Sequence, residues 1–241
     1  MKTILSTEFT LLAAASAWAQ SADLDENMRR YGLVDIRSLD DGILVELRYS
    51  TEDNFVGRDM YGDLETAYLL PHFARKVVEA QRLLKELHPE YTLLIYDAAR
   101  PISVQRTMRR MVEGTPNESC VADGSRGGRH NYGVAVDLTI ARSDGRPIDM
   151  GTGFDHFGDE ASVKGTPDTD QASTRTIEVY REYISSLARS GIISDQAAAN
   201  RILLIEVMCQ AGLVPYRREW WHFEEIISMP ETRRRYRLLD F

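Results

Sequence analysis

Two short stretches of the sequence contain residue types that bind metal ions and activate water. In the first, His130 precedes Asp137, with Gly133 between them. In the second, Glu219 precedes His222 within the aromatic run EWWHF. Two histidines and one carboxylate would give a zinc ion three protein ligands and leave one position for water. A further carboxylate nearby can act as general base, so this combination indicates the chemistry of a metal-dependent hydrolase.

Spacing alone leaves a structural alternative open for both stretches. A single histidine–aspartate pair at this distance is more often a solvated strand end than a pair of ligands. The aromatic run favours a strand, and its bulky rings would shield a site from water. On a regular strand Glu219 and His222 face opposite sides, so they share a site only if a bulge or bend intervenes.

The residues around Asp137 predict a strand that presents this aspartate to a cleft. The segment 133–140 alternates in character, and its apolar face consists of Val134, Val136, Leu138 and Ile140. Asp137 lies on the opposite, more polar face, as suits a ligand directed into a cleft. His130 comes just before the strand, where Gly133 lets the chain bend back.

The remaining patterns predict one α+β domain. Strands are expected at 33–37, 43–49, 91–96 and 220–226, the first two joined by a turn, and helices at 67–87, 103–113, 173–189 and 194–211, with a loop at 114–129. The last helix is expected to be capped by Ser194 and ended by Gly212. Strands and helices do not alternate strictly, which favours a central antiparallel sheet flanked by helices, with the metal site in a cleft on the sheet.

Composition narrows the class of protein. The 241 residues are 43% hydrophobic and 27% charged, which is typical of a globular chain and excludes low-complexity or disordered classes. Acidic residues outnumber basic ones by 37 to 29, so neither nucleic acid nor an anionic membrane surface is expected as a partner. The only cysteines, Cys120 and Cys209, exclude a disulfide scaffold and a thiolate zinc site. We expect two free thiols, although export would allow a disulfide between them.

The N-terminal residues predict a signal peptide. Lys2 is followed by the apolar stretch 9–16 and by Ala17-Trp18-Ala19, a cleavage pattern. We therefore expect a signal peptide at 1–19, a mature domain at 20–241 and export, most simply to the periplasm. The apolar stretch is too short to span a bilayer, so no stable membrane insertion is expected. The alternative is an N-terminal helix of the fold in a cytoplasmic protein.

The ordered motifs carry a family resemblance. They are Asn54-Phe55-x-Gly57, Tyr96-Asp97-Ala98-Ala99-Arg100-Pro101, His130-x2-Gly133-x-Ala135-x-Asp137-Leu138-Thr139, Met150-Gly151-Thr152-x-Phe154-Asp155 and Glu219-Trp220-Trp221-His222-Phe223. This set, from about residue 32 to residue 226, resembles the zinc D-alanyl-D-alanine dipeptidases of the VanX type, within the DD-peptidase/hedgehog-like metallopeptidases. Each motif alone is modest, but their order and spacing together are specific.

The resemblance implies a mechanism for the two metal-binding stretches. It implies one zinc ion per chain, with His130, Asp137 and His222 as ligands. It also implies Glu219 as the catalytic base that activates a zinc-bound water, and Arg100 as the group that steadies the developing oxyanion. The family mechanism therefore agrees with the hydrolase chemistry that the residue types indicate.

The resemblance also implies a substrate, a free D-Ala-D-Ala dipeptide or a similar dipeptide of D-amino acids. Asp155 is the expected partner of its ammonium group, and His156 is the nearest competitor for a ligand role. The sequence departs from the family at Gly128, where relatives usually have serine, and at Tyr132, where they often have arginine. Ser125 replaces the lost hydroxyl only if the glycine-rich loop folds inward. These departures put the exact substrate range in question.

Two alternatives to the dipeptidase remain at the level of sequence. One is a D,D-carboxypeptidase or endopeptidase of the same fold that acts on peptidoglycan stem peptides, which export favours. The other is a zinc-stabilised binding module without catalysis. A structural site closes its fourth metal position and needs neither Glu219 nor Arg100, so their presence argues against the module. The sequence predicts no particular oligomeric state.

Overall fold

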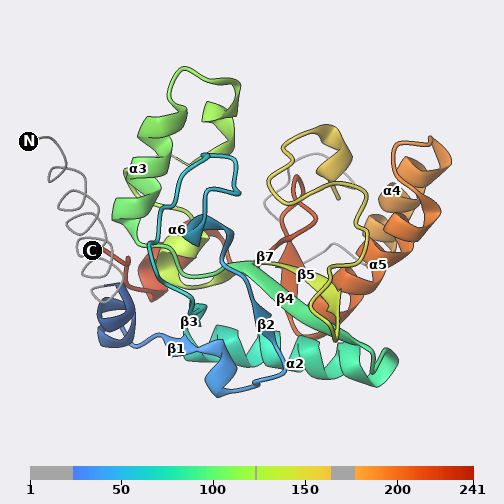
Figure 1. Ribbon diagram of the computed structural model, residues 1–241, viewed down its shortest axis with the longest axis horizontal. Coiled ribbons are helices and arrows are strands. Elements are labelled where there is room, and N and C mark those ends of the chain that lie inside the picture. Colours follow the sequence, from blue (N-terminus) through green and yellow to red (C-terminus); the bar gives the residue numbers. More distant parts are fainter. Residues whose placement is uncertain (1–23, 123, 164–176) are drawn as a thin grey trace, which may run out of the picture.

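The computed structural model describes residues 24–122, 124–163 and 177–241 (Figure 1). The predicted signal peptide at 1–19 lies outside these residues, as does the start of the helix predicted at 173–189. Within the described residues, no helix has both the length and the apolar character needed to cross a bilayer.

A five-stranded sheet forms the centre of the α+β domain, in the order β2-β4-β5-β7-β6. Its strands are β2 (Leu44–Val45), β4 (Tyr91–Asp97), β5 (Ala135–Arg142), β6 (Leu213–Pro215) and β7 (His222–Glu225). All neighbouring strands are antiparallel except β2 and β4, which are parallel. The predicted fold class is confirmed, with this parallel pair as the exception to an antiparallel sheet.

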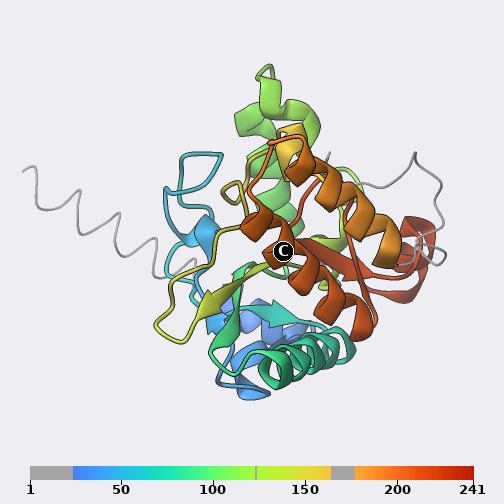
Figure 2. The ribbon, with the colours of Figure 1, turned by 90° about the vertical axis from the view of Figure 1, so that its right-hand side faces the viewer.

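Helices cover the sheet on several sides. They are α2 (Pro71–Leu87), α3 (Ile102–Val112), α4 (Ile177–Arg189), α5 (Asp195–Gln210) and α6 (Met229–Arg235), and residues 24–30 are also helical. Figure 1 shows α2 along one side of the sheet, and Figure 2 turns the adjacent pair α4 and α5 toward the viewer. Helix α5 packs against α2 and β6, so the same helix contacts both the sheet and its covering layer.

The long helix α2 illustrates how the sequence pattern positions the sheet. Its buried side chains recur at helical spacing and are Phe73, Ala74, Val77, Ala80, Gln81 and Leu84. The helix begins at Pro71, later than the predicted residue 67, because residues 68–69 form strand β3. Gln81 accepts the backbone N–H of Leu93 at 2.8 Å and donates to the Thr92 hydroxyl at 2.8 Å, which fixes α2 to β4.

The predicted N-terminal hairpin is wrong. Residues 33–37 and 43–49 contribute only β1 (Val34–Asp35) and β2, each followed by a short 3-10 helix, η1 (Ile36–Ser38) and η2 (Arg48–Ser50). Strand β1 pairs with β3 (Tyr68–Leu69) instead, and β2 pairs with β4. A local cause is visible at η1, where the Asp35 carboxylate accepts the N–H of Arg37 and turns the chain out of the extended conformation.

Near the C-terminus the structure adds β6, a strand that the sequence analysis did not predict, and the short helix α6. The predicted strand at 220–226 is shorter, because only residues 222–225 pair with neighbours. The predicted ends of α5 are confirmed: the Ser194 hydroxyl accepts the N–H of Ala197 at 3.0 Å, and Gly212 has a left-handed φ of 82°. The loop predicted at 114–129 contains a 3-10 turn, η3 (Pro116–Cys120).

Candidate metal centre

Three neighbouring strands place polar side chains in one row across the sheet. Asp137 on β5 is the direct cross-strand partner of Asp97 on β4 and of His222 on β7. Directly opposite residues of antiparallel strands present their side chains on the same face. A register shift between Ile95 and Asp97 adjusts the row at the β4 side. The row therefore lies on the polar face that the alternation of β5 predicts.

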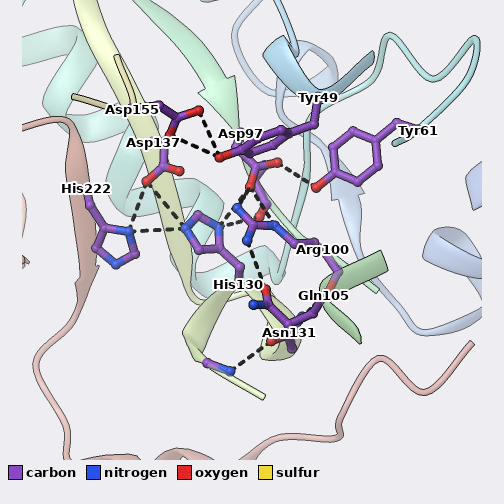
Figure 3. A network of polar contacts seen from close by, with 12 residues as sticks. Tyr49, Tyr61, Asp97, Arg100, Gln105, His130, Asn131, Asp137, Asp155 and His222 are labelled. Carbon is purple, nitrogen blue, oxygen red and sulfur yellow. Dashed lines mark hydrogen bonds and ion pairs between the residues drawn. The ribbon is translucent and has the colours of Figure 1, made fainter. Parts of the chain in front are cut away.

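His130 enters this row from a 3-10 helix, η4 (Arg129–Tyr132), just before β5. Gly133 ends the turn with a φ of 67°, and a Cβ at this position would lie 2.7 Å from Leu33 Cδ2. Only glycine adopts this bend without strain, which agrees with its predicted role. The bend directs His130 Nε2 to 3.3 Å from Asp137 Oδ1 and to 3.1 Å from His222 Nδ1 (Figure 3).

The three predicted ligands form a group that fits a metal ion. His222 Nδ1 lies 2.9 Å from Asp137 Oδ1, and one ligand atom from each of the three side chains lies within 4.8 Å of the others. Among the described residues this is the only such group of histidine, cysteine or carboxylate side chains. Two imidazole nitrogens and one carboxylate oxygen are the donor set of a catalytic zinc site with an open fourth position.

The second nitrogen of each imidazole has its own acceptor. His130 Nδ1 lies 2.6 Å from the carbonyl oxygen of Ala98, and His222 Nε2 lies 3.3 Å from Glu224 Oε2. Both acceptors favour a proton on the outer nitrogen, so the inner nitrogens face the common centre. Burial lowers the pKa of His222, but hydrogen bonds to Asp137 and Glu224 outweigh it and raise the pKa to about 10.

Glu219 reaches the same centre because the chain turns before β7. The N–H of His222 donates to the carbonyl oxygen of Glu219 at 3.4 Å, and the N–H of Tyr216 donates to that of His222 at 2.8 Å. This turn is the bend that the sequence required, and it leaves Glu219 Oε2 3.9 Å from His222 Nδ1. Burial raises the pKa of Glu219 to about 7.

Arg100 is held beside the row by a buried network that the sequence analysis did not identify. Its Nε and Nη2 donate to Asp97 Oδ2 at 3.1 and 2.5 Å, and its Nη1 donates to Gln105 Oε1 at 2.9 Å (Figure 3). Tyr61 donates to the other oxygen of Asp97 at 2.7 Å. Burial lowers the pKa of Arg100, but the Asp97 carboxylate raises it well above its usual value, so the guanidinium stays charged.

Asp155 lies near Arg100 and is connected to it through Tyr49. The Tyr49 hydroxyl lies 3.0 and 3.1 Å from the two carboxylate oxygens of Asp155, and the Arg100 guanidinium stacks 4.9 Å from the centre of the Tyr49 ring. Asp155 is the only described residue other than glycine with a positive φ, at 60°. Burial, and then the negative charge of Asp137, raise the pKa of Asp155 well above its usual value. A nearby cation would relieve this cost.

One cavity of about 1330 Å³ joins these groups. Its wall includes the three predicted ligands together with Arg100, Asp155 and Glu219. His156, the predicted competitor, also lines the cavity but is exposed, is absent from the metal-binding group and pairs with Glu160 at 3.1 Å.

The positions that depart from the family are also placed. Gly128 lines the cavity, whereas Ser125 is exposed on the loop. Tyr132 is buried, and its hydroxyl donates to the carbonyl oxygen of Arg126 at 2.9 Å. Its ring therefore packs in the fold and its hydroxyl fastens the loop before η4.

Sequence reasoning missed Asp97, Tyr49 and Glu224 as parts of the site. Asp97 is part of the family motif that also contains Arg100. Its position at the end of an apolar strand is a signal that could have indicated a buried carboxylate. Glu224 follows His222 by two positions on a strand, a spacing that puts both side chains on one face. Tyr49 had no signal, because only the folded chain brings it to Asp155.

An α+β domain in which two histidines and an aspartate converge beside a partly buried glutamate has the construction of a metallopeptidase. The model of the M15 peptidase family, described as D-ala-D-ala dipeptidase, matches residues 29–237. A D-alanyl-D-alanine dipeptidase of Escherichia coli (strain K12) is 30% identical, over 80% of this chain and 83% of that protein. A D-alanyl-D-alanine dipeptidase of Synechocystis sp. is 27% identical, over 70% of this chain and 73% of that protein. The chain belongs to the D-ala-D-ala dipeptidase family, which confirms the resemblance and the class of hydrolase.

Proposed function

We propose that this protein is a zinc-dependent dipeptidase that hydrolyses D-Ala-D-Ala, or a closely similar dipeptide of D-amino acids, to free amino acids. The observation that carries the proposal is the group of two histidines and one aspartate within 4.8 Å, with Glu219 beside it. The family and the names of both relatives support the substrate class.

The metal would be held by His130 Nε2, a carboxylate oxygen of Asp137 and His222 Nδ1. When bound, zinc supplies a Lewis acid that lowers the pKa of a water molecule and polarises the scissile carbonyl group. Nitrogen and oxygen ligands of this kind also accept other first-row metals, so the choice of zinc rests on the family resemblance.

Glu219 is the proposed general base and then the general acid. It takes a proton from the attacking water as the water oxygen bonds to the carbonyl carbon. It then gives that proton to the amine nitrogen as the C–N bond breaks. A carboxyl group whose pKa is raised to about 7 by burial can both accept and release a proton near neutral pH.

Arg100 is proposed to stabilise the negative charge that develops on the carbonyl oxygen. A guanidinium has five N–H groups, and the bonds to Asp97 and Gln105 use three of them. The remaining N–H groups are available to the substrate because Arg100 lines the cavity. A fixed, permanently charged donor of this kind needs no rearrangement as the charge forms.

Asp155 is proposed to bind the ammonium group of the substrate. Its carboxylate is buried next to Asp137, where a positive charge is favourable. Tyr49 and the N–H of Phe55, at 3.5 Å, fix the carboxylate in place. An ammonium partner inside the site selects substrates with a free amino end at the first residue, as a dipeptide has.

The size of the cavity favours a second candidate, cleavage of longer peptidoglycan stem peptides. Pockets for small ligands usually have volumes of roughly 300–1,000 Å³, and this cavity is about 1330 Å³. Its wall also includes Asn117 and Pro230, outside the metal-binding group. A stem peptide that ends in D-Ala-D-Ala would use this extra space.

The predicted signal peptide suggests where the enzyme meets its substrate. We propose that residues 1–19 direct the chain to the periplasm, where peptidoglycan fragments arise. Fractionation of expressing cells, followed by N-terminal sequencing, tests this. A mature chain that starts at residue 20 in the periplasmic fraction supports export, and a full-length chain in the cytoplasm contradicts it.

Amine release from D-Ala-D-Ala tests the catalytic proposal. The same assay is run on L-Ala-L-Ala and on a pentapeptide ending in D-Ala-D-Ala, before and after a chelator, and after zinc is added back. We expect chelator-sensitive cleavage of the D,D-dipeptide that zinc restores. The Glu219→Gln variant, prepared in the same way, should cleave it about 10²- to 10⁴-fold more slowly, which excludes a contaminating enzyme. Cleavage of the pentapeptide alone would favour the second candidate, and zinc binding with no cleavage would favour the binding module.

A further inference from the structure

Glu224 makes contacts that the proposed reaction does not use. It lies two positions after His222 on β7, on the same face of the sheet. Its Oε2 lies 3.3 Å from His222 Nε2 and 2.6 Å from Arg129 Nε. The side chains of these three residues are 12% to 17% exposed, so the contacts are largely shielded from water.

Arg129 is itself fixed by the element on its far side. Its Nη1 donates to the Thr232 hydroxyl at 3.0 Å, and Thr232 is fully buried in α6. The Thr232 hydroxyl in turn donates to the carbonyl oxygen of Ser228 at 3.1 Å. A chain of polar contacts thus runs from α6 through Arg129 and Glu224 to the imidazole of His222.

The two histidines of the metal-binding group differ in this respect. The outer nitrogen of His130 has the neutral carbonyl oxygen of Ala98 at hydrogen-bonding distance, 2.6 Å, and the Asp97 carboxylate only at 3.6 Å. The outer nitrogen of His222 has a carboxylate as its acceptor, at 3.3 Å, and a guanidinium holds that carboxylate in place. A hydrogen bond to a charged acceptor is stronger than one to a neutral acceptor. Outer-shell partners of this kind orient a ligand imidazole and raise its basicity.

We propose that Glu224, held by Arg129, is a positioning residue for the metal centre: by accepting the Nε2–H of His222, it turns Nδ1 toward His130 and Asp137. This inference rests on the proposed function only in that His222 is taken as a ligand. Arg129 acts on His222 through Glu224.

The neighbouring carboxylate Glu225 provides a matched control. It is on the same strand, buried to 8% exposure, and faces the other side of the sheet. Its partners are Tyr236 of the C-terminal segment, at 2.6 Å, and His72 of α2, at 3.3 Å. Replacing Glu225 therefore removes a comparable buried carboxylate without touching the metal-binding group.

The test measures zinc affinity by competition with a chromogenic chelator, using zinc alone. We expect Glu224→Ala to weaken zinc binding about 10- to 100-fold. Glu224→Gln, which keeps an acceptor oxygen but not the charge, should fall between Glu224→Ala and the wild type. Glu225→Gln should bind zinc like the wild type. Circular dichroism of each variant shows whether it is folded.

A double-mutant cycle tests the role of Arg129. Arg129→Gln should weaken zinc binding in the wild-type background and have no further effect in the Glu224→Ala background, because Arg129 acts only through that carboxylate. In zinc-loaded protein with 15N-labelled histidine, the Nε2–H signal of His222 should shift in Glu224→Ala and stay in place in Glu225→Gln.

The outcomes separate this inference from the proposed function. If wild type and Glu224→Ala bind zinc equally, the positioning role is wrong while the metal site stands. If a folded wild-type chain does not bind zinc, the metal site and the positioning role are both wrong. An equal loss of affinity in Glu224→Ala and Glu225→Gln would also overturn the inference, because it would show a general effect of losing a buried carboxylate.

Discussion

Asp137 and His222 are directly opposite each other on β5 and β7, with Asp137 Oδ1 and His222 Nδ1 2.9 Å apart. The hydrogen-bonding register of two central strands therefore sets the distance between two proposed ligands. A slip of one residue in this register would turn one side chain to the other face of the sheet. The main apolar core buries Val136, Leu138 and Ile140 on one face of β5 and opposes that slip, so the packing of the fold protects the geometry of the site.

The first prediction separates the roles of Glu219 and His222. Glu219→Gln should keep its zinc and lose about 10²- to 10⁴-fold in kcat, the usual contribution of a general acid–base group. His222→Ala should lose activity and also more zinc affinity than the roughly 10- to 100-fold typical of outer-shell changes, since it removes one of three ligands. Bound zinc is measured by elemental analysis after dialysis, beside the rate of amine release. Equal metal loss in both variants would refute these roles.

The second prediction concerns the buried ion pair of Asp97 and Arg100. Asp97 is fully buried and accepts three hydrogen bonds, so Asp97→Ala leaves a charged guanidinium without its partner. Loss of one partner of a buried pair costs about 3–5 kcal/mol of unfolding free energy. We therefore expect a lower midpoint of urea unfolding for Asp97→Ala than for the wild type. Both proteins are measured without metal, so that a change in metal binding cannot contribute to the difference.

Asp144 is the control for this measurement. Its carboxylate pairs with Arg146 at 2.6 Å, but on the exposed turn after β5. Exposed pairs contribute little because water screens them. Asp144→Ala should unfold at the same urea concentration as the wild type. If Asp97→Ala and Asp144→Ala have equal midpoints, burial does not strengthen the pair of Asp97 and Arg100.

Much of the fold could be predicted because its long elements have clear periodicity. The helix at 71–87 and the strands at 91–97 and 135–142 each bury enough apolar surface to decide their own conformation. The prediction of a hairpin at 33–49 was wrong because its strands are too short to decide their own conformation. Two-residue strands gain little from local pairing, and their partners, Tyr68–Leu69 and β4, are chosen by tertiary contacts.

The residues of the site show the same difference between local sequence signals and tertiary contacts. Local spacing picked out His130 with Asp137 and Glu219 with His222 as candidates, and the family resemblance supplied their expected roles as ligands and base. Tyr49 could not be found from the sequence, since it lies in η2 and meets Asp155, 106 positions later, only in the folded chain. For Glu219, the sequence analysis predicted that a bulge or bend must precede His222 if the two share a site, because a regular strand would place them on opposite faces. The turn before β7 is that bend.

The third prediction concerns the pH dependence of Cys209 alkylation. Cys209 is a free thiol, and burial raises its pKa to about 12, while the side chain of Cys120 is outside the described part of the chain. Because the folded pKa is above the ordinary value of 9.0, the thiol stays protonated at pH 9 where an unfolded chain is half ionised. Thiolate is the reactive form, so alkylation at pH 9 should be about 500-fold slower in the folded protein.

Mass spectrometry of the peptide that contains Cys209, after iodoacetamide treatment of reduced protein, follows this reaction. The denatured chain at the same pH is the reference. In the folded protein the rate should keep rising tenfold per pH unit above pH 9 without a plateau. A rate that is half-maximal near pH 9 and levels off above about pH 10 would show that the thiol has an ordinary pKa.

The last prediction uses Gly128, the cavity residue at a position where the family resemblance implies serine. Its φ of −97° is open to any residue, and a Cβ there would meet only Ala122 Cβ, at 3.9 Å. Gly128→Ser should therefore fold normally and place a hydroxyl on the cavity wall. One added neutral hydrogen bond to the substrate contributes about 0.5–1.5 kcal/mol, which corresponds to a rise of roughly 2- to 12-fold in kcat/KM for D-Ala-D-Ala. Gly128→Ala adds the same Cβ without the hydroxyl, so the ratio of the two variants isolates the hydrogen bond. Identical kcat/KM values for them would show that this hydroxyl makes no contact with the dipeptide, and that the departure from the family does not set its substrate range.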